Sequence, residues 1–336
     1  MKTWTSNGIR AGTITPRDLL QRDRRSGYPA EYLLSRIRGR RSRLIRDWRA
    51  LLSGTSPADY LSSPLYHGFV RERTLDGLWR SLLKEHGWVF GQMEEGLRRT
   101  LAPYFLYAEL RTVMICLRLL EGEKAQQIGE ALADSLLDDR VQAVLSEEEP
   151  EAAVAGLEEV LVPLSGAFRG LAAVYRDAGL RGLEQRLAHR FLQAMLERPL
   201  HPVLRELFVR IIDARNILAL YKSLKFGARD PSVFLEGGTI TTGRLQELQE
   251  RGDLLAVTGI VRLASGSAIS APEPTQVEVA LYRGITRFLK RAGRDPLGTA
   301  VIMEYLWRCS LEVTNLSVLF AGKDLTREDV AEELVS

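Results

Sequence analysis

The chain has 336 residues, of which 45% are hydrophobic and 26% are charged, and its formal net charge is only +3. This composition excludes a disordered chain, because the apolar side chains suffice for a substantial core, and the near-neutral charge argues against a uniformly basic coat for nucleic acid. Residues 1–50 stand apart, since 13 basic and four acidic residues give them a local charge of +9. The length exceeds that of a typical single domain, so we expect two or three units or one repetitive architecture.

Simple features of the chain argue against membrane insertion and against secretion. No uncharged stretch approaches the roughly 18 apolar residues that span a bilayer, and the first 20 residues lack the apolar segment of a secretory signal. Two cysteines, Cys116 and Cys309, are too few for a disulfide framework. We therefore expect a reducing, cytosolic setting, with Cys116 as an inert thiol in an apolar helix.

The N-terminal region is predicted to be loosely ordered. Residues 1–27 precede the first strong helical pattern, and their low apolar content predicts a mobile basic arm with one marginal helix over 16–25. Helix starts are indicated where a hydroxyl residue stands three positions before a carboxylate, at Thr15, Ser56 and Thr326.

The remainder of the chain is predicted to be all-α. The run 202–224 is apolar over more than half of its circumference, which indicates a central helix packed on several sides. The two-residue alternation of strands is confined to short runs at 238–242 and 256–263, each flanked by Gly. The Ser-, Ala- and Pro-containing segment 266–274 is the best candidate for a linker.

An internal repeat is indicated by three segments, 109–113, 213–217 and 312–316, which lie 104 and 99 residues apart. Each reads acid, apolar, polar, Thr or Asn, aliphatic; aromatic residues precede each one, and a small or Gly-containing break follows.

This pattern predicts three copies of one helical unit after the arm of 1–27, with boundaries at 28–136, 137–240 and 241–336. The acid and the residues two or three positions later do not share a helix face, so each acid is expected to meet an Arg or the backbone of another helix. Such buried charges are structural more often than catalytic. The polar residues in this register are Glu109, Arg111, Asp213, Arg215, Asn216, Glu312 and Asn315.

The start, middle and end of the chain resemble one known family. The run from Tyr32 to Ile45 is similar to the N-terminal signature of the C subunit of archaeal and bacterial A/V-type ATP synthases, whose eukaryotic counterpart is the d subunit of the vacuolar proton pump. The run from Glu304 through Asn315 to the acidic last helix resembles its C-terminal signature. The segment 213–216, followed by 234–238, is similar to its middle portion.

The resemblance covers residue 28 to the end, with a few departures. Residues 1–27 have no counterpart, Arg40 stands where Met is usual, and the first repeat has Thr112 in place of the amide.

The resemblance implies an all-helical funnel or socket with pseudo-threefold symmetry. It implies a peripheral subunit on the cytoplasmic face of the membrane, placed between the central shaft of a rotary ATPase and the proteolipid ring and passing torque between them. Such a subunit has no active site or cofactor of its own. The resemblance leaves open whether protons or sodium ions are transported and whether the complex makes or hydrolyses ATP.

Motifs for chemistry are absent from the sequence. Gly322-Lys323 lacks the upstream glycine and the hydroxyl residue of a phosphate-binding loop, and is interpreted as a helix end. The four histidines have no partner at helical spacing, so no metal site is predicted; His201 is expected at a helix start. We predict no catalytic, cofactor-binding or metal-binding residues.

Two charged regions remain, and both are open to two interpretations. An Arg-rich helix is either a solvated helix whose side-chain stems cover apolar surface or a docking face for a partner's carboxylates, carbonyls or anionic headgroups. The span 130–159, with ten acids, is either a solvated helical hairpin or a counterpart that pairs with the Arg-rich helix. The Arg residues proposed to bind a partner are Arg36, Arg38, Arg40, Arg41 and Arg43.

Two other classes of function were weighed. A helical nucleic-acid-binding adaptor using residues 10–49 would show strongly salt-dependent affinity for nucleic acid, but no RNA-binding module is recognised. An all-α enzyme would need a pocket with converging titratable groups, for which the sequence offers no constellation.

Overall fold

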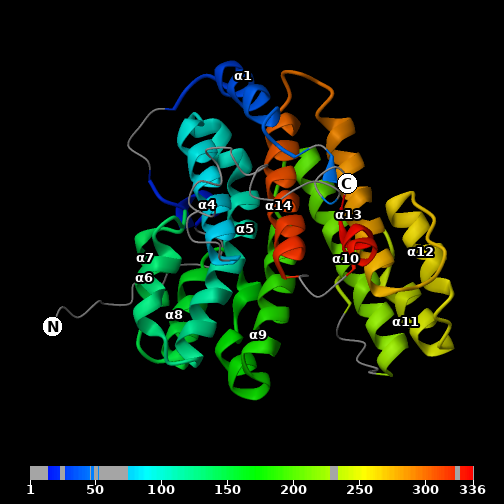
Figure 1. Ribbon diagram of the computed structural model, residues 1–336. Helices are drawn as coiled ribbons and strands as arrows, with labels where there is room; N and C mark the ends of the chain where they lie inside the picture. Colours follow the sequence, from blue (N-terminus) through cyan, green and yellow to red (C-terminus); the bar gives the residue numbers. More distant parts are fainter. Residues whose placement is uncertain are drawn as a thin grey trace. The chain divides into compact units, whose positions relative to one another are not determined.

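The fold is helical throughout the part of the chain that the structure describes. The computed structural model describes residues 14–22, 27–45, 47, 48, 52, 75–227, 234–321 and 326–335. Over these residues it contains α-helices, short 3-10 turns and two isolated bridges, with no strands, so the all-α prediction is confirmed. The chain divides into two compact units: unit 1 is Met1–Ser26 with Glu94–Leu200, and unit 2 is Gly27–Met93 with His201–Ser336 (Figure 1).

Unit 1 is built on a 27-residue helix, α5, whose apolar residues are buried along most of its length. Helix α5 packs against α8 and α9, and α7 packs against α8, which agrees with the interpretation of the acidic span as a helical hairpin. Helix α9 bends at Gly179, where φ is 64°. The bounds are η1 Pro16–Leu19, α5 Glu95–Glu121, η4 Ala125–Gln127, α6 Ile128–Leu132, α7 Asp139–Leu145, α8 Pro150–Leu161, η5 Gly166–Phe168 and α9 Leu171–Leu196.

The acidic hairpin meets partners within unit 1. Glu158 accepts hydrogen bonds from the backbone N–H groups of Gly170 (2.7 Å) and Ala172 (3.0 Å) at the start of α9. There its negative charge opposes the positive end of the helix dipole. Glu151 pairs with Arg176 on the same helix.

Residues 14–22, within the predicted arm, are packed into unit 1. Thr15 and Asp18 form the predicted capping box, but the turn it opens is a 3-10 helix of four residues, shorter than the predicted helix. Leu19 and Leu20 are buried, and the backbone of Leu19 accepts a hydrogen bond from the N–H of Asp138 (3.0 Å). These residues are therefore an integral part of unit 1; 1–13 and 23–26 lie outside the described residues.

Unit 2 surrounds α10, the predicted central helix. Twelve of its residues are buried, and it packs against α11, α12 and α13. The helix begins after His201, whose ring accepts from the N–H of Val203 (3.3 Å) as predicted for a helix start, and ends at Gly227, where φ is 73°. The bounds are α1 Ala30–Arg41, α4 Leu75–Gln92, α10 Pro202–Phe226, α11 Thr242–Arg251, α12 Ala256–Ser265, α13 Pro274–Ala292, α14 Ala300–Ala321 and α15 Arg327–Glu333.

Helix α14 connects the two chain segments that form unit 2, because it packs against α1 and α4 of the first segment and against α13 and α15 of the second (Figure 1). The two runs with strand-like alternation are the helix α12 and a turn, and the segment 266–274 is a loop between α12 and α13 inside unit 2. The predicted helix start at Ser56 and the predicted helix end at Gly322-Lys323 lie outside the described residues. The division into three repeats stays a prediction.

Candidate functional site

The Arg-rich segment forms helix α1, and its apolar side chains anchor it in unit 2. Leu33, Leu34 and Ile37 are buried at the spacing of one helix face, and α1 packs on α14. The helix ends at Arg41, and the hydroxyl of Ser42 donates to the carbonyl of Gly39 (2.7 Å). With this face buried, the Arg side chains are directed to its borders and to solvent.

Arg40 is held by a buried acid on α4. Its Nε donates to Oε1 of Glu85 (2.7 Å), and Nη2 binds Oε2 of the same carboxylate, which is a bidentate charge-assisted pair. The hydroxyl of Tyr305 also donates to Glu85 (2.5 Å). Burial disfavours the charged guanidinium, but the hydrogen bond and charge of Glu85 raise the pKa of Arg40. Burial also raises the pKa of Tyr305, and the charges of Cys309 and Glu85 add to this rise.

The outer Arg residues of α1 contact polar and aromatic groups. Arg36 donates to Oε1 of Gln92 (3.0 Å), and its guanidinium lies 5.0 Å from the ring centroid of Trp88. The guanidinium of Arg40, which binds Glu85, lies 4.0 Å from the centroid of the same ring. Arg38 donates to the carbonyl oxygen of Pro296. Arg36, Arg38 and Arg43 are exposed, whereas Arg40 and Arg41 are half-buried.

Arg41 faces a buried acid on α14. Its Nη2 lies 3.0 Å from Oε2 of Glu304, and Nη1 of Arg308 lies 3.6 Å from Oε1 of the same carboxylate. Within the described residues, Oε2 of Glu304 receives no hydrogen bond, so the contact with Arg41 is an ion pair without hydrogen-bond geometry. The guanidinium N–H groups of Arg41 are therefore available to a further acceptor.

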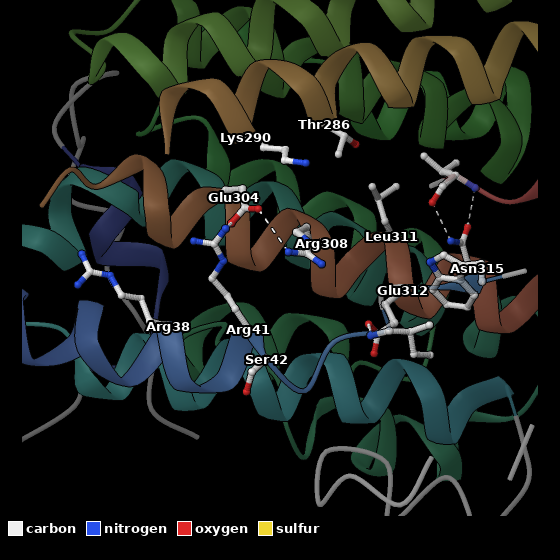
Figure 2. A pocket seen from close by; sticks show the side chains of 13 residues that line it. Arg38, Arg41, Ser42, Thr286, Lys290, Glu304, Arg308, Leu311, Glu312 and Asn315 are labelled. Atoms are coloured by element: carbon white, nitrogen blue, oxygen red, sulfur yellow. Dashed lines mark hydrogen bonds and ion pairs between the residues drawn. The ribbon is translucent and has the colours of Figure 1, made fainter. Parts of the chain in front are cut away.

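These groups line a cavity of about 580 Å³ between α1, α13 and α14, inside unit 2. Figure 2 shows Lys290 and Thr286 on α13 facing Arg308 and Leu311 on α14, with Arg41 extending from α1 toward Glu304 and Arg38 extending to the side. Four cationic and two anionic side chains therefore share one cavity with apolar groups. The lining residues are Arg38, Arg41, Ser42, Ile45, Trp48, Thr286, Lys290, Glu304, Arg308, Leu311, Glu312, Asn315 and Val335.

The acids of the predicted repeats bind backbone and hydroxyl groups. On α5, the two oxygens of Glu109 accept from the hydroxyl of Ser135 (2.9 Å) and the N–H of Leu136 (2.7 Å), 26 and 27 residues later. On α10, the two oxygens of Asp213 accept from the hydroxyl of Thr239 (2.6 Å) and the N–H of Ile240 (3.2 Å), again 26 and 27 residues later. Burial raises the pKa of both carboxyls, although these hydrogen bonds oppose it.

The third acid, Glu312 on α14, differs in its partner. One of its oxygens accepts from the N–H of Ile45 (2.8 Å), 267 residues away.

The amide positions repeat more closely. Asn216 exchanges two hydrogen bonds with the backbone of Leu235 (2.7 and 2.8 Å), and Asn315 does the same with Val335 (2.9 and 3.0 Å). Each of the three acids accepts from a backbone N–H, but the donors Leu136, Ile240 and Ile45 lie outside the helices and not in another helix as predicted.

The two Arg residues of the predicted repeats are less buried than the acids and amides, since Arg111 is exposed and Arg215 is half-buried. Sequence reasoning missed the acids that pair with the Arg-rich helix and the α13 side of the cavity. A usable signal existed for the repeat sites: a hydroxyl residue followed by an aliphatic residue stands 26 residues after each of the first two acids. No such signal points to Lys290.

Other chemistry finds little support in the described part of the chain. Cys116 and Cys309 are buried free thiols, and burial, helped by Glu109, raises the pKa of Cys116 to about 12, as expected for an inert core thiol. Over the described residues, His, Cys, Asp and Glu side chains do not gather in groups of three that could hold a metal ion. None of the described helices combines the length and the apolarity that crossing a membrane requires.

Comparisons with known proteins give one result. Residues 33–334 match the family described as ATP synthase (C/AC39) subunit, which is nearly the whole chain. This finding agrees with the resemblance seen at the start, middle and end of the sequence. No curated protein matches the chain.

Proposed function

Because the chain belongs to the ATP synthase (C/AC39) subunit family, we propose that it is a non-catalytic subunit of a rotary A/V-type ATPase that couples the central shaft to the membrane proteolipid ring. The observation that carries this proposal is the family match over residues 33–334. The subunit is peripheral to the membrane, on its cytoplasmic face, and transmits torque while protons or sodium ions cross the ring.

The outer face of α1 supports a docking role. Tyr32 on α1 (47% exposed) and Tyr28 just before the helix (46% exposed) have ring centroids 4.7 Å apart, and Arg36 on α1 and Arg43 just after the helix are exposed as well. Exposed Tyr and Arg side chains are typical anchors of protein–protein interfaces. We assign partner contacts to these four residues.

Arg40 and Arg41 have a different role in this proposal. Each faces a buried carboxylate of its own chain, Glu85 or Glu304, and these pairs fix α1 on α4 and α14. A helix that transmits force to a partner must be firmly held by its own unit. Because these two pairs neutralise the positive charges of Arg40 and Arg41, less positive charge is left for the phosphate contacts that a nucleic-acid-binding role for this helix would need.

The test is co-purification of the full chain with the shaft subunits and with the detergent-extracted proteolipid ring at low salt. We expect both to bind, and the binding to weaken as salt rises, because exposed charges are screened. The double variant Arg36→Gln, Arg43→Gln is expected to lower binding of at least one partner.

The matched control is the double variant Arg181→Gln, Arg186→Gln, which removes the same charge from exposed positions on α9. An equal loss in both variants would assign the effect to overall charge. Failure of the wild-type chain to bind either partner at low salt would refute the proposed function.

A further inference from the structure

The cavity between α1, α13 and α14 has more cationic than anionic groups. Among the described residues, Arg38, Arg41, Lys290 and Arg308 line it, against two carboxylates on α14, so these side chains together carry a surplus of two positive charges. Its volume of about 580 Å³ lies within the range of roughly 300 to 1,000 Å³ of small-molecule sites. The cavity is therefore large enough for a small ligand, and the surplus of cationic side chains favours an anionic one.

Both carboxylates are already engaged. Glu304 is only 2% exposed and lies between Arg41 and Arg308, and Glu312 is 3% exposed and accepts from the N–H of Ile45. They cannot turn toward Lys290 without losing these contacts. In contrast, the cations keep many donors: among the described residues, Arg41 and Arg308 make ion pairs only, and Lys290 has no acidic partner.

We propose that this cavity binds a phosphate monoester, held by Arg41, Arg308 and Lys290. Three cationic side chains are offered to the ligand, and a phosphate monoester provides three acceptor oxygens and a charge of about −1.5 to −2 at neutral pH, whereas a carboxylate provides two oxygens and a single charge. Guanidinium groups present paired N–H donors that fit the oxygens of a phosphate, and the Lys ammonium adds a point charge.

The apolar part of the lining receives the group that the phosphate carries. Trp48, Leu311 and Val335 line the same cavity as the cations. A phosphate attached to an apolar or aromatic group can contact both the cationic and the apolar side chains of the cavity, whereas inorganic phosphate can contact only the cationic ones. Soluble phosphate esters and the phosphate headgroup of a lipid share this chemistry.

The test is titration calorimetry of the full chain with phenyl phosphate, a monoester with an apolar ring, and with benzoate, which carries the same ring on a single carboxylate. We expect phenyl phosphate to bind more tightly than benzoate. Lys290→Gln is expected to weaken phenyl phosphate binding by about tenfold or more, since it removes one charge-assisted contact. Lys290→Arg is expected to restore most of the affinity.

The matched control is Arg291→Gln, which removes the same charge from the next residue of α13, which is exposed and does not line the cavity. We expect it to leave the affinity within about twofold of the wild type. The proposal is overturned if phenyl phosphate does not bind, if benzoate binds as well as phenyl phosphate, or if both Gln variants weaken binding equally. Lys290 is exposed, so a thermal unfolding scan separates loss of binding from loss of fold.

A second arm identifies the source of the phosphate. The chain is mixed with phosphatidylcholine vesicles that contain phosphatidic acid, whose headgroup is a phosphate monoester, or phosphatidylserine as the control. Binding to the first vesicles alone, displaced by phenyl phosphate, supports the site with a lipid as its ligand. Calorimetric binding without vesicle binding supports the site with a soluble ligand. Because neither arm uses shaft or ring, the result is independent of the proposed function.

Discussion

Glu109 in unit 1 holds the segment between α6 and α7, and Asp213 in unit 2 holds the segment between α10 and α11, whereas Glu312 on α14 holds Ile45, which is 267 residues away. The first two acids bind donors at identical separations of 26 and 27 residues, one hydroxyl and one backbone N–H each. The amide three residues after the third acid keeps a local partner, since Asn315 binds Val335 20 residues later. Helix α14 therefore combines one local contact with one between distant segments.

The difference shows that a buried carboxylate accepting from a backbone N–H can stabilise either a local or a long-range contact. At Glu109 and Asp213, a buried carboxylate with two donors fixes a later segment of the same unit on its helix, and closing such a short segment costs little entropy. When the donor comes from Ile45, the same kind of bond depends on a segment whose position is set by α1 and its ion pairs to Glu85 and Glu304. The local sites are expected to be stable on their own, and the distant one to follow the docking of α1.

The largest effects are expected at the local sites. Asp213→Ala leaves the hydroxyl of Thr239 and the N–H of Ile240 without their acceptor, and an unsatisfied buried donor costs about 1 to 3 kcal/mol. We expect a loss of about 3 kcal/mol in the free energy of unfolding of unit 2, measured by urea denaturation. Glu109→Ala is expected to have a similar effect in unit 1.

Hydrogen exchange supplies the local control for these two variants, because a chain with two units need not unfold in one step. Asp213→Ala is expected to speed exchange of the Ile240 amide and to leave that of Leu136 unchanged, and Glu109→Ala to do the reverse. Full protection of Ile240 in Asp213→Ala would show that the carboxylate does not hold the loop.

A smaller effect is expected from crowding the Asp213 site without removing the acid. A Cβ at Gly238 would lie 2.4 Å from Oδ1 of Asp213, closer than real contacts allow. Gly238→Ala is expected to cost about 2 kcal/mol, in the range of overpacking in a buried site. The matched control is Gly243→Ala at the start of α11, where a Cβ would meet nothing within 4 Å; thermal unfolding midpoints that fall equally would contradict the steric explanation.

The fold class and the central helix could be predicted because they depend on local patterns. Apolar spacing over 202–224 was enough to predict α10, and the hydroxyl and carboxylate at Thr15 and Thr326 marked two caps that the structure contains. The length of the first of these helices could not be predicted, because η1 packs against α5 and Leu20 then pairs with Leu137 in a β-bridge in place of continuing a helix.

The candidate site was only half predictable, since its partners are distant in sequence. The run of Arg residues was visible, but which of them meet an acid depends on Glu85 on α4 and Glu304 on α14, brought to α1 by packing. Lys290 is one of many basic residues in the sequence, and its place in the cavity could not be predicted because it depends on the packing of α13 beside α14.

A still smaller effect is expected at the distant site. Glu312→Gln keeps an oxygen that can accept from the N–H of Ile45 but removes the charge, which is worth about 1 kcal/mol for a charge-assisted bond. We expect faster exchange of the Ile45 amide, with that of Ile240 unchanged. If exchange at Ile240 rises as well, the two sites in unit 2 are coupled and the distinction between local and distant contacts fails.

The smallest effect concerns pH at the Asp213 site. Burial raises the pKa of Asp213 above its ordinary value of 3.8, although hydrogen bonds from Thr239 and Ile240 and the charge of Arg210 oppose the rise. The folded state therefore keeps the proton to a higher pH than the unfolded state, so the proton-linked stability is complete below 3.8 and is lost as pH rises through the raised pKa.

Asp213→Asn cannot titrate, and urea unfolding of both proteins from about pH 3 to pH 7 isolates this contribution. The wild-type free energy of unfolding minus that of the variant is expected to fall as pH rises through the window and then to stay level. A difference that rises with pH would mean that the donors of Thr239 and Ile240 outweigh burial and that the pKa of Asp213 is lowered. Glu109→Gln gives the same test in unit 1, where burial also raises the pKa of the acid.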